Sequence, residues 1–260
     1  MASTTHLIER KEQWGTVLSG CPLQASAWLA GAQGPGLPGG ESAVTHFPVT
    51  ASMPGTITGS RARIGLDVGG FLIGRTRAPA SRSVTGLLPA TVAGAPDVEA
   101  IGAAYAGITA DDLEIGWPYL PNHHGGIQLS PIGVHLEGLE VIAVGRPGRP
   151  VRFGLTVTRG FVSIEGVPFA ELPHVIPPNY EVHVPIDPAQ GIAALIVFNE
   201  QVTTDDEGRP TQVPESGHPY LFDPEAGSGY VNAAHLMLPG TSAVDITVGH
   251  AAVLQSPPRP

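Results

Sequence analysis

The chain has very little cysteine, lysine or charge of any kind, and each shortage narrows its possible functions. Cys21 is the only cysteine among 260 residues, so an intramolecular disulfide and the cysteine patterns of structural zinc are excluded. Lys11 is the only lysine, and the arginines form no basic stripe. With a formal net charge of −10, nucleic acid and anionic membrane surfaces are not expected as partners. The sequence contains no apolar run of about 18 residues, so no transmembrane helix is predicted.

Glycine and proline are abundant instead, with 34 and 27 residues, and 42% of the chain is apolar. Short apolar segments with alternating residues, separated by turn signals, predict an all-β fold. A β-sandwich or jelly-roll-like stack of antiparallel strands fits this spacing best. We expect the clearest strands at residues 62–68, 71–75, 84–92, 127–144, 151–157, 161–164, 180–186, 192–198, 230–238 and 243–253.

Two segments carry a helical pattern. Residues 4–18 predict a short N-terminal helical arm, because their apolar residues fall on one helical face behind Ser and Thr caps. Residues 96–108 predict one mid-chain helix, with Val98, Ile101 and Tyr105 at helical spacing. Asp111, Asp112 and Glu114 are then interpreted as helix-capping and surface charges.

A glycine-rich stretch at residues 30–42 indicates a link between the arm and the body. The expected organisation is therefore an N-terminal arm and Gly/Pro-rich link at 1–42, and a β-sandwich domain at 43–254. A loose tail is expected at 255–260.

Three motifs follow one another in the last third of the chain. An apolar strand ends in Asn199-Glu200-Gln201, and the segments YVNAAHLMLPG at 230–240 and AVDITVGHAAV at 243–253 come after it. This order resembles the end of the actinobacterial proteins called choice-of-anchor P. The resemblance implies a secreted or surface-exposed β-protein with no established catalysis. It is carried by Asn199, Glu200, Gln201, Val231, Asn232, Ala233, His235, Asp245, Val248, Gly249 and Ala251.

The cellular location is left open by the N-terminus. It reads MASTTHLIERKEQWGTVLSG, and it lacks the basic region and apolar run of a standard export signal. A cytoplasmic location is therefore the alternative to the secreted or surface location that the resemblance implies.

The same C-terminal motifs also predict local structure. Asn199 and Gln201 are expected to satisfy backbone groups where strand pairing stops. Two histidines on adjacent strands, His235 and His250, could meet across the pair. We therefore predict Asn199, Glu200, Gln201, His235 and His250 as binding residues. Strict alternation places His235 with Val231, Ala233 and Met237, and His250 with Val244, Ile246 and Val248.

Two further groups are candidate sites. His123 and His124 lie in the loop PNHHGG and are the candidate metal ligands, so a divalent metal is the alternative to an absence of cofactors. Trp117 and Tyr119 lie beside prolines and predict a platform for a sugar or small molecule.

The leading functional hypothesis is a non-catalytic structural or binding protein that acts through self-assembly, as a homo-oligomer, or through surface interaction. It rests on the low charge, on the Gly/Pro-rich strands and on the resemblance. The alternative is a metal-dependent enzyme or small-molecule-binding protein with a His-lined pocket inside the β-fold. A third hypothesis is a cyclisation or isomerisation catalyst that shapes an apolar substrate without a recognisable motif.

Overall fold

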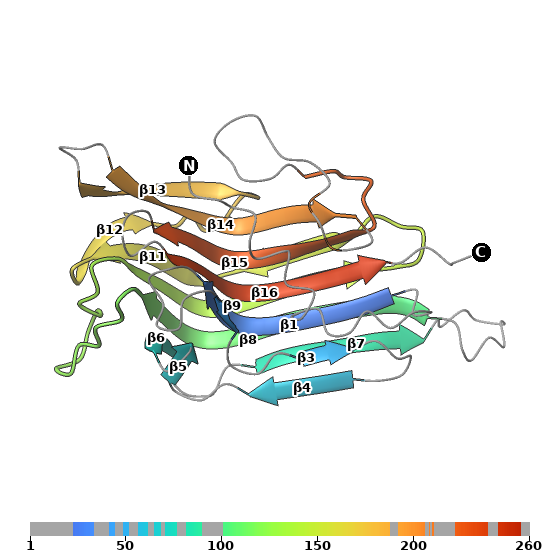
Figure 1. Cartoon of the computed structure of the whole chain (residues 1–260), viewed down its shortest axis with the longest axis horizontal. Coiled ribbons are helices and arrows are strands. Elements are labelled where there is room, and N and C mark those ends of the chain that lie inside the picture. Colours follow the sequence, from blue (N-terminus) through green and yellow to red (C-terminus); the bar gives the residue numbers. More distant parts are fainter. Residues whose placement is uncertain are drawn as a thin grey trace.

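The protein is an all-β molecule of two antiparallel sheets, as the sequence predicts (Figure 1). The computed structural model describes residues 23–33, 42–44, 49–51, 57–61, 65–68, 71–76, 82–89, 101–187, 192–205, 208, 210, 222–238 and 244–255. Within these ranges no residue is helical, and no helix is long and apolar enough to cross a membrane.

Sheet A is built mainly from the C-terminal strands, with β1 (Leu23–Gln33) inserted beside the last strand of the chain. Three of its seven strands are long and largely buried on both faces. Its order is β13 (Tyr180–Asp187), β14 (Ile192–Thr204), β15 (Ser228–Leu238), β16 (Val244–Gln255), β1 and β2 (Ser42–Val44), with β3 (Val49–Ala51) also paired to β1.

Sheet B is built around a long hairpin-like pair, β8 (Ile101–Gly116) and β9 (Gly133–Gly145). Its order is β12 (Val167–Glu171), β11 (Arg159–Ile164), β9, β8, β6 (Phe71–Thr76) and β5 (Gly65–Val68). Three strands pair outside this path: β10 (Arg152–Thr156) with β9, β7 (Arg82–Pro89) with β8, and β4 (Ile57–Arg61) with β7.

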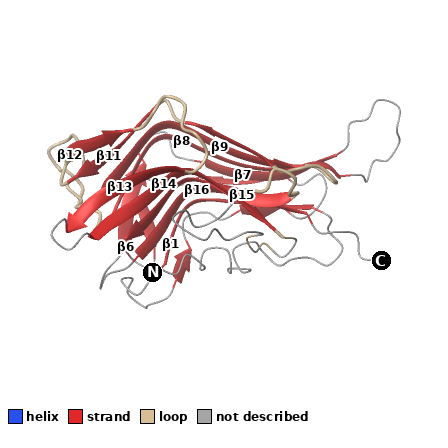
Figure 2. Ribbon diagram, turned by 90° about the horizontal axis from the view of Figure 1, so that it is seen from above, coloured by secondary structure: helices blue, strands red, loops and turns tan. Residues whose placement is uncertain are grey.

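The hydrophobic core fills the space between the two sheets, which Figure 2 shows as two curved layers. Alternate residues of each strand enter it, for example Ala104, Ala106 and Ile108 of β8, and Ala251 and Val253 of β16, which contacts β8 across the core. Burial of this apolar surface, at roughly 25 cal/mol per Å², is the main stabilising term.

The alternation of faces reverses once along each of the central strands. In β16 the core residues are Val244, Ile246 and Val248, and then Ala251 and Val253. The reversal falls at Gly249, whose φ is +62°. In a regular strand Val248 and His250 would share a face. The left-handed backbone at Gly249 turns the strand between them, so that they point to opposite faces.

Other strands reverse at the same level. Asn199 in β14 has φ +51°, and Gly138 in β9 has φ +60°. The pairing register is unchanged on the two sides of the reversal, since Ala234 pairs with Val248 and Asn232 pairs with His250. The positions of reversal in neighbouring strands therefore lie side by side in a row, which we call the kink row. Both sheets bend at this row.

The structure corrects three sequence predictions. The described part of the mid-chain helix, residues 101–108, belongs to strand β8, because its backbone pairs with β9 and its alternate residues enter the core between the sheets. Asp112 and Glu114 consequently lie on a strand and cap no helix. Residues 23–33 lie inside the predicted arm and link but form strand β1, which pairs with β16. The predicted helix at 4–18, the range 96–100 and most of the tail lie outside the described residues.

Candidate functional site

A row of chemically distinctive side chains crosses sheet A. Strand register places Glu200 opposite Asn232, Asn232 opposite His250, and His250 opposite Trp28. The residues next to them along the strands, such as Val231 and Ala251, belong to the inter-sheet core. The row therefore lies on the face of sheet A that points away from sheet B. We call these four residues and the adjoining His235 the Glu200 cluster.

Hydrogen bonds connect the Glu200 cluster. The Asn232 Nδ2 donates to Glu200 Oε2 at 2.7 Å, and His235 Nδ1 lies 3.0 Å from Glu200 Oε1. The Asn232 Oδ1 is 2.7 Å from His250 Nδ1. Because Asn232 donates through its amide nitrogen to Glu200, its oxygen accepts from His250, which therefore carries a proton on Nδ1. Both histidines are thus oriented through Nδ1.

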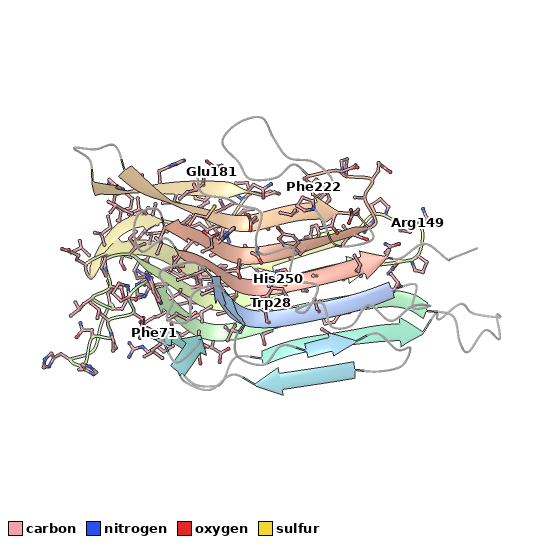
Figure 3. All side chains as sticks on the ribbon, viewed as in Figure 1. Trp28, Phe71, Arg149, Glu181, Phe222 and His250 are labelled. Carbon is pink, nitrogen blue, oxygen red and sulfur yellow. The ribbon has the colours of Figure 1, made fainter. Side chains whose placement is uncertain are left out.

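Aromatic rings enclose His250. Its imidazole is stacked on Trp28 with ring centroids 3.4 Å apart and an interplanar angle of 12°, and Tyr230 stacks 5.1 Å away. Figure 3 labels Trp28 and His250 next to each other on β1 and β16. All residues of the Glu200 cluster are buried.

The two histidines have opposite electrostatic environments. Burial lowers the pKa of His250 well below its ordinary value, so this ring is neutral. Burial also opposes charge on His235, but the adjacent Glu200 carboxylate, by charge and hydrogen bond, and the charge of Asp245 raise its pKa. Glu200 accordingly favours a proton on His235, whereas His250 is an uncharged donor.

Several predicted site residues therefore come together: Glu200, His235 and His250 do, through Asn232. Asn199 and Gln201 lie beside them but serve another contact. The Asn199 Nδ2 donates to the Ile176 carbonyl at 2.9 Å, and the Gln201 backbone N–H donates to Asn179 Oδ1 at 2.8 Å. These two bonds attach the loop before β13 to β14.

The face assignment of the two histidines was wrong. Val231 and Ala233 lie in the inter-sheet core, but His235 lies on the opposite face. His250 is likewise separated from Val248 by the reversal at Gly249. Strict alternation fails because each strand has a residue in the kink row between the two positions.

A second site lies on the outer face of sheet B. Register places Asp112 opposite Glu137 and Glu137 opposite Arg159, while the next row contains Arg75, Glu114, His135 and Phe161. A pocket of about 270 Å³ opens over these two rows. It is lined by Asp112, Glu114, Gly126, Ile127, His135, Glu137, Arg159 and Phe161, and we call it the Glu114 pocket.

Glu114 is the buried carboxylate of this pocket. Its Oε2 accepts from Arg75 Nε at 2.7 Å and from the Tyr119 hydroxyl at 3.1 Å. This hydrogen bond and the charge of Glu114 outweigh burial and raise the pKa of Arg75. His135 Nδ1 lies 3.8 Å from Glu114 Oε1, so a proton on this ring would face the carboxylate.

The opposite wall of the Glu114 pocket is fixed by ring contacts. The His135 ring stacks on Phe161 with centroids 4.3 Å apart and an angle of 8°, and its Nε2 lies 3.1 Å from Ser163 Oγ. The Arg159 guanidinium lies 5.7 Å from the Phe161 centroid. The polar groups of the pocket are therefore held on strands, and their orientation is largely set before a ligand arrives.

The predicted loop residues have different positions. Tyr119 supports the pocket through its bond to Glu114, and Trp117 tilts against Phe71 with centroids 6.2 Å apart. His123 and His124 are exposed in the loop between β8 and β9. Within the described part of the chain, no three His, Cys, Asp or Glu side chains are grouped to hold a metal ion. The metal site at His123 and His124 stays a prediction.

Sequence reasoning missed most of the Glu114 pocket and also Trp28. The pocket residues come from separate strands, and the available signal was polar residues at alternate positions of β8, β9 and β11. Trp28 was hidden because its strand fell inside the predicted arm and link. Comparison of the chain with family models, with curated proteins and with solved structures gave no significant match.

Proposed function

We propose that the protein is a non-catalytic binding protein that recognises a small polyhydroxylated ligand, a mono- or disaccharide, in the Glu114 pocket. The observation that carries this proposal is the set of opposed hydrogen-bonding groups on one open surface of sheet B. Asp112 and Glu137 offer acceptors, and Arg159 offers a fork of donors. Neighbouring hydroxyls of a sugar donate and accept at once, so they match such a surface.

The shape of the site supports this ligand class. The pocket volume of about 270 Å³ is close to the lower end of the usual range for small-molecule sites. Ile127 and Phe161 add apolar contact beside the polar groups. Glu114 of the pocket lining is paired with Arg75, so its charge is already balanced and a neutral ligand brings no uncompensated charge.

Fixed side chains favour binding because little conformational entropy is lost. Glu114 is held by Arg75 and Tyr119, and His135 is held by Phe161 and Ser163. Preorganised groups raise affinity by reducing the cost of ordering. The order of motifs that resembles choice-of-anchor P proteins supports a secreted or surface location for this binding, which belongs to the same proposal.

Ligand-observed NMR with a panel of neutral mono- and disaccharides tests the proposal. We expect at least one sugar to bind, and Glu137→Gln to weaken its binding about tenfold through the loss of a charged acceptor. Glu140→Gln is the matched control, because Glu140 is also exposed on β9 but does not line the pocket. No binding by any sugar, or equal weakening by both changes, would count against the proposal.

Self-assembly into a homo-oligomer is the second candidate function, and one observation favours it. Strand β12 ends sheet B, and two of its large apolar side chains are exposed, Val167 by 64% and Phe169 by 44%. Apolar residues on an end strand favour association with another copy. Light scattering on concentrated protein tests this, with Phe169→Ser expected to reduce the mass of the assembly. A wild-type mass that stays monomeric rejects it.

A further inference from the structure

Large apolar side chains are exposed together at one end of sheet B. Among the described residues, nine large apolar side chains are exposed. Six of them lie at this end, each with 42% to 64% of its surface exposed: Phe71, Leu72, Leu120, Leu129, Val167 and Phe169. Soluble monomers seldom expose so many large apolar groups in one region, and such a region marks a contact with a protein or a membrane.

The first residues of β6 lie beside the loop that follows β8. Strand β6 pairs with β8 with Gly74 opposite Ile115, so its first residues extend past the end of β8. Phe71 is therefore level with the start of the segment 117–131, and its ring centroid lies 6.2 Å from that of Trp117. Figure 3 shows Phe71 at one end of the molecule and Phe222 at the other.

The hairpin between β11 and β12 lies at the same end. Gly133, the first residue of β9, pairs with both Gly116 and Ser163, so β8 and β11 end at the same level. The Glu165 backbone N–H, in the hairpin turn, donates to the Ser130 carbonyl at 3.0 Å. The start of β6, the loop and the hairpin therefore form one end of sheet B. We call it the loop tip, and it consists of residues 71–72, 117–131 and 164–169.

Hydrogen bonds hold the two leucines of the loop in place. The Leu129 N–H donates to the Leu120 carbonyl at 2.7 Å, and the Leu120 N–H donates to Ser130 Oγ at 2.9 Å. The buried Gln128 donates through Nε2 to the Ile115 carbonyl at 2.8 Å, which fixes the loop on β8. The exposure of both leucines is thus a property of the folded chain. Groups fixed in this way lose little conformational entropy when a partner buries them.

The loop tip carries almost no charge. Its only Asp, Glu, Lys or Arg residue is Glu165. The charges of the Glu114 pocket are set back, because Asp112 and Arg159 each lie four residues before the strand positions that pair with Gly133. At roughly 3.3 Å per residue, this separation is about 13 Å. An apolar medium can therefore cover the tip without burying the charges of the pocket, which would be costly.

Charge and geometry together define the partner. The tip has no Lys or Arg and the chain has a formal net charge of −10, so anionic lipid headgroups are not attracted. The apolar side chains come from three separate segments, and a bilayer needs no matching shape to receive them. Trp117, which is partly exposed beside Phe71, is of a residue type enriched at membrane–water interfaces.

We propose that the loop tip binds the surface of a bilayer of zwitterionic lipid and inserts its apolar side chains among the headgroups. Burial of these side chains supplies the affinity, since it removes apolar surface from water. This contact goes beyond the proposed function and does not depend on it, because the two involve different residues and different partners.

Flotation of the full chain with phosphatidylcholine vesicles in a density gradient tests the proposal. We expect the protein to float with these vesicles at low and at high salt alike, because apolar burial is not an interaction between charges. Addition of phosphatidylserine to the vesicles should not strengthen binding. An absence of flotation with phosphatidylcholine overturns the proposal, as does binding that requires phosphatidylserine and is lost in high salt.

Variants locate the contact. The double change Leu120→Ser and Leu129→Ser should weaken binding to phosphatidylcholine vesicles about tenfold, through the loss of two apolar side chains. Phe222→Ser is the matched control, because Phe222 is 41% exposed but contacts Phe153 at the opposite end of the molecule. Equal binding by the wild type and the double variant overturns the proposal. If the double variant does not fold, Val167→Ser, at the most exposed tip position, decides in the same way.

A second copy of the chain is the competing occupant of the loop tip. Light scattering without vesicles should give the same mass for the wild type and for the Leu120→Ser, Leu129→Ser variant. An assembly of the wild type whose mass falls in this variant would assign the tip to contact between copies and overturn the membrane proposal.

Discussion

His250 and Trp28 stack face to face with ring centroids 3.4 Å apart, although 222 positions of sequence separate them. The contact exists because β1 and β16 pair in antiparallel register along most of their length. It places a neutral histidine between the indole of Trp28 and the amide of Asn232. The ionisation of this histidine is consequently coupled to folding.

His250 should make the protein acid-sensitive. Its pKa is lowered in the folded state, so the unfolded chain takes up a proton near the ordinary value of about 6.5 while the folded chain does not. Stability should therefore fall as pH drops below about 6.5. His250→Gln should remove this contribution, which urea unfolding between pH 5 and 8 would measure. Parallel stability curves for the wild type and the variant would contradict the prediction.

His235 should show the opposite dependence. Its pKa is raised in the folded state, so its contribution is complete below the ordinary value and is lost as pH rises through the folded value. The stability difference between the wild type and His235→Gln should shrink as pH rises. Histidine Cε1–H signals in the NMR spectrum would report the two titrations separately. A His235 signal that titrates below the ordinary value would refute this assignment.

The kink row should be sensitive at Gly249. An alanine there must adopt φ +62°, and its Cβ would lie 2.9 Å from Ala233 Cβ and 3.2 Å from Val141 Cγ2. Strain and overpacking together predict a loss of about 2 kcal/mol or more in the free energy of unfolding. Urea denaturation measures this loss. Gly154→Ala is the control, and a similar small effect of both changes would show that the kink tolerates a side chain.

The Glu114 pocket should depend on its internal ion pair. Glu114→Gln weakens the contacts to Arg75 and Tyr119 and should cost about 1–3 kcal/mol of stability. A double-mutant cycle with Arg75→Met isolates the pair, because the second change should cost less once the first is present. Strictly additive losses would mean that the Arg75–Glu114 contact contributes nothing to stability.

Much of the fold follows from the sequence because apolar alternation and turn residues are local signals. Three predicted strands nearly coincide in residue range with observed ones: 151–157 with β10, 161–164 with β11 and 230–238 with β15. The helical prediction for residues 101–108 was wrong, because a segment of Ile, Gly, Ala and Tyr fits the period of a helix and that of a strand. Only the pairing of Ala104, Ala106 and Ile108 with β9 decides for a strand.

The candidate sites were predictable only where their residues lie in adjacent motifs. Glu200, His235 and His250 come from three consecutive strands, so motif order was enough to associate them. Their shared face could not be predicted, since the positive φ of Gly249 and Asn199 depends on how both sheets bend. Asp112, Glu137 and Arg159 lie on strands whose register only the fold supplies.

The insertion of β1 beside β16 has a consequence for how the chain folds during synthesis. Leu23 pairs with Gln255, so β1 leaves the ribosome long before the strand that it pairs with. Until then β1, which carries apolar residues such as Leu29, has one edge without its paired strand. Contacts between such distant positions slow folding. Sheet A can therefore close only after translation has passed β16.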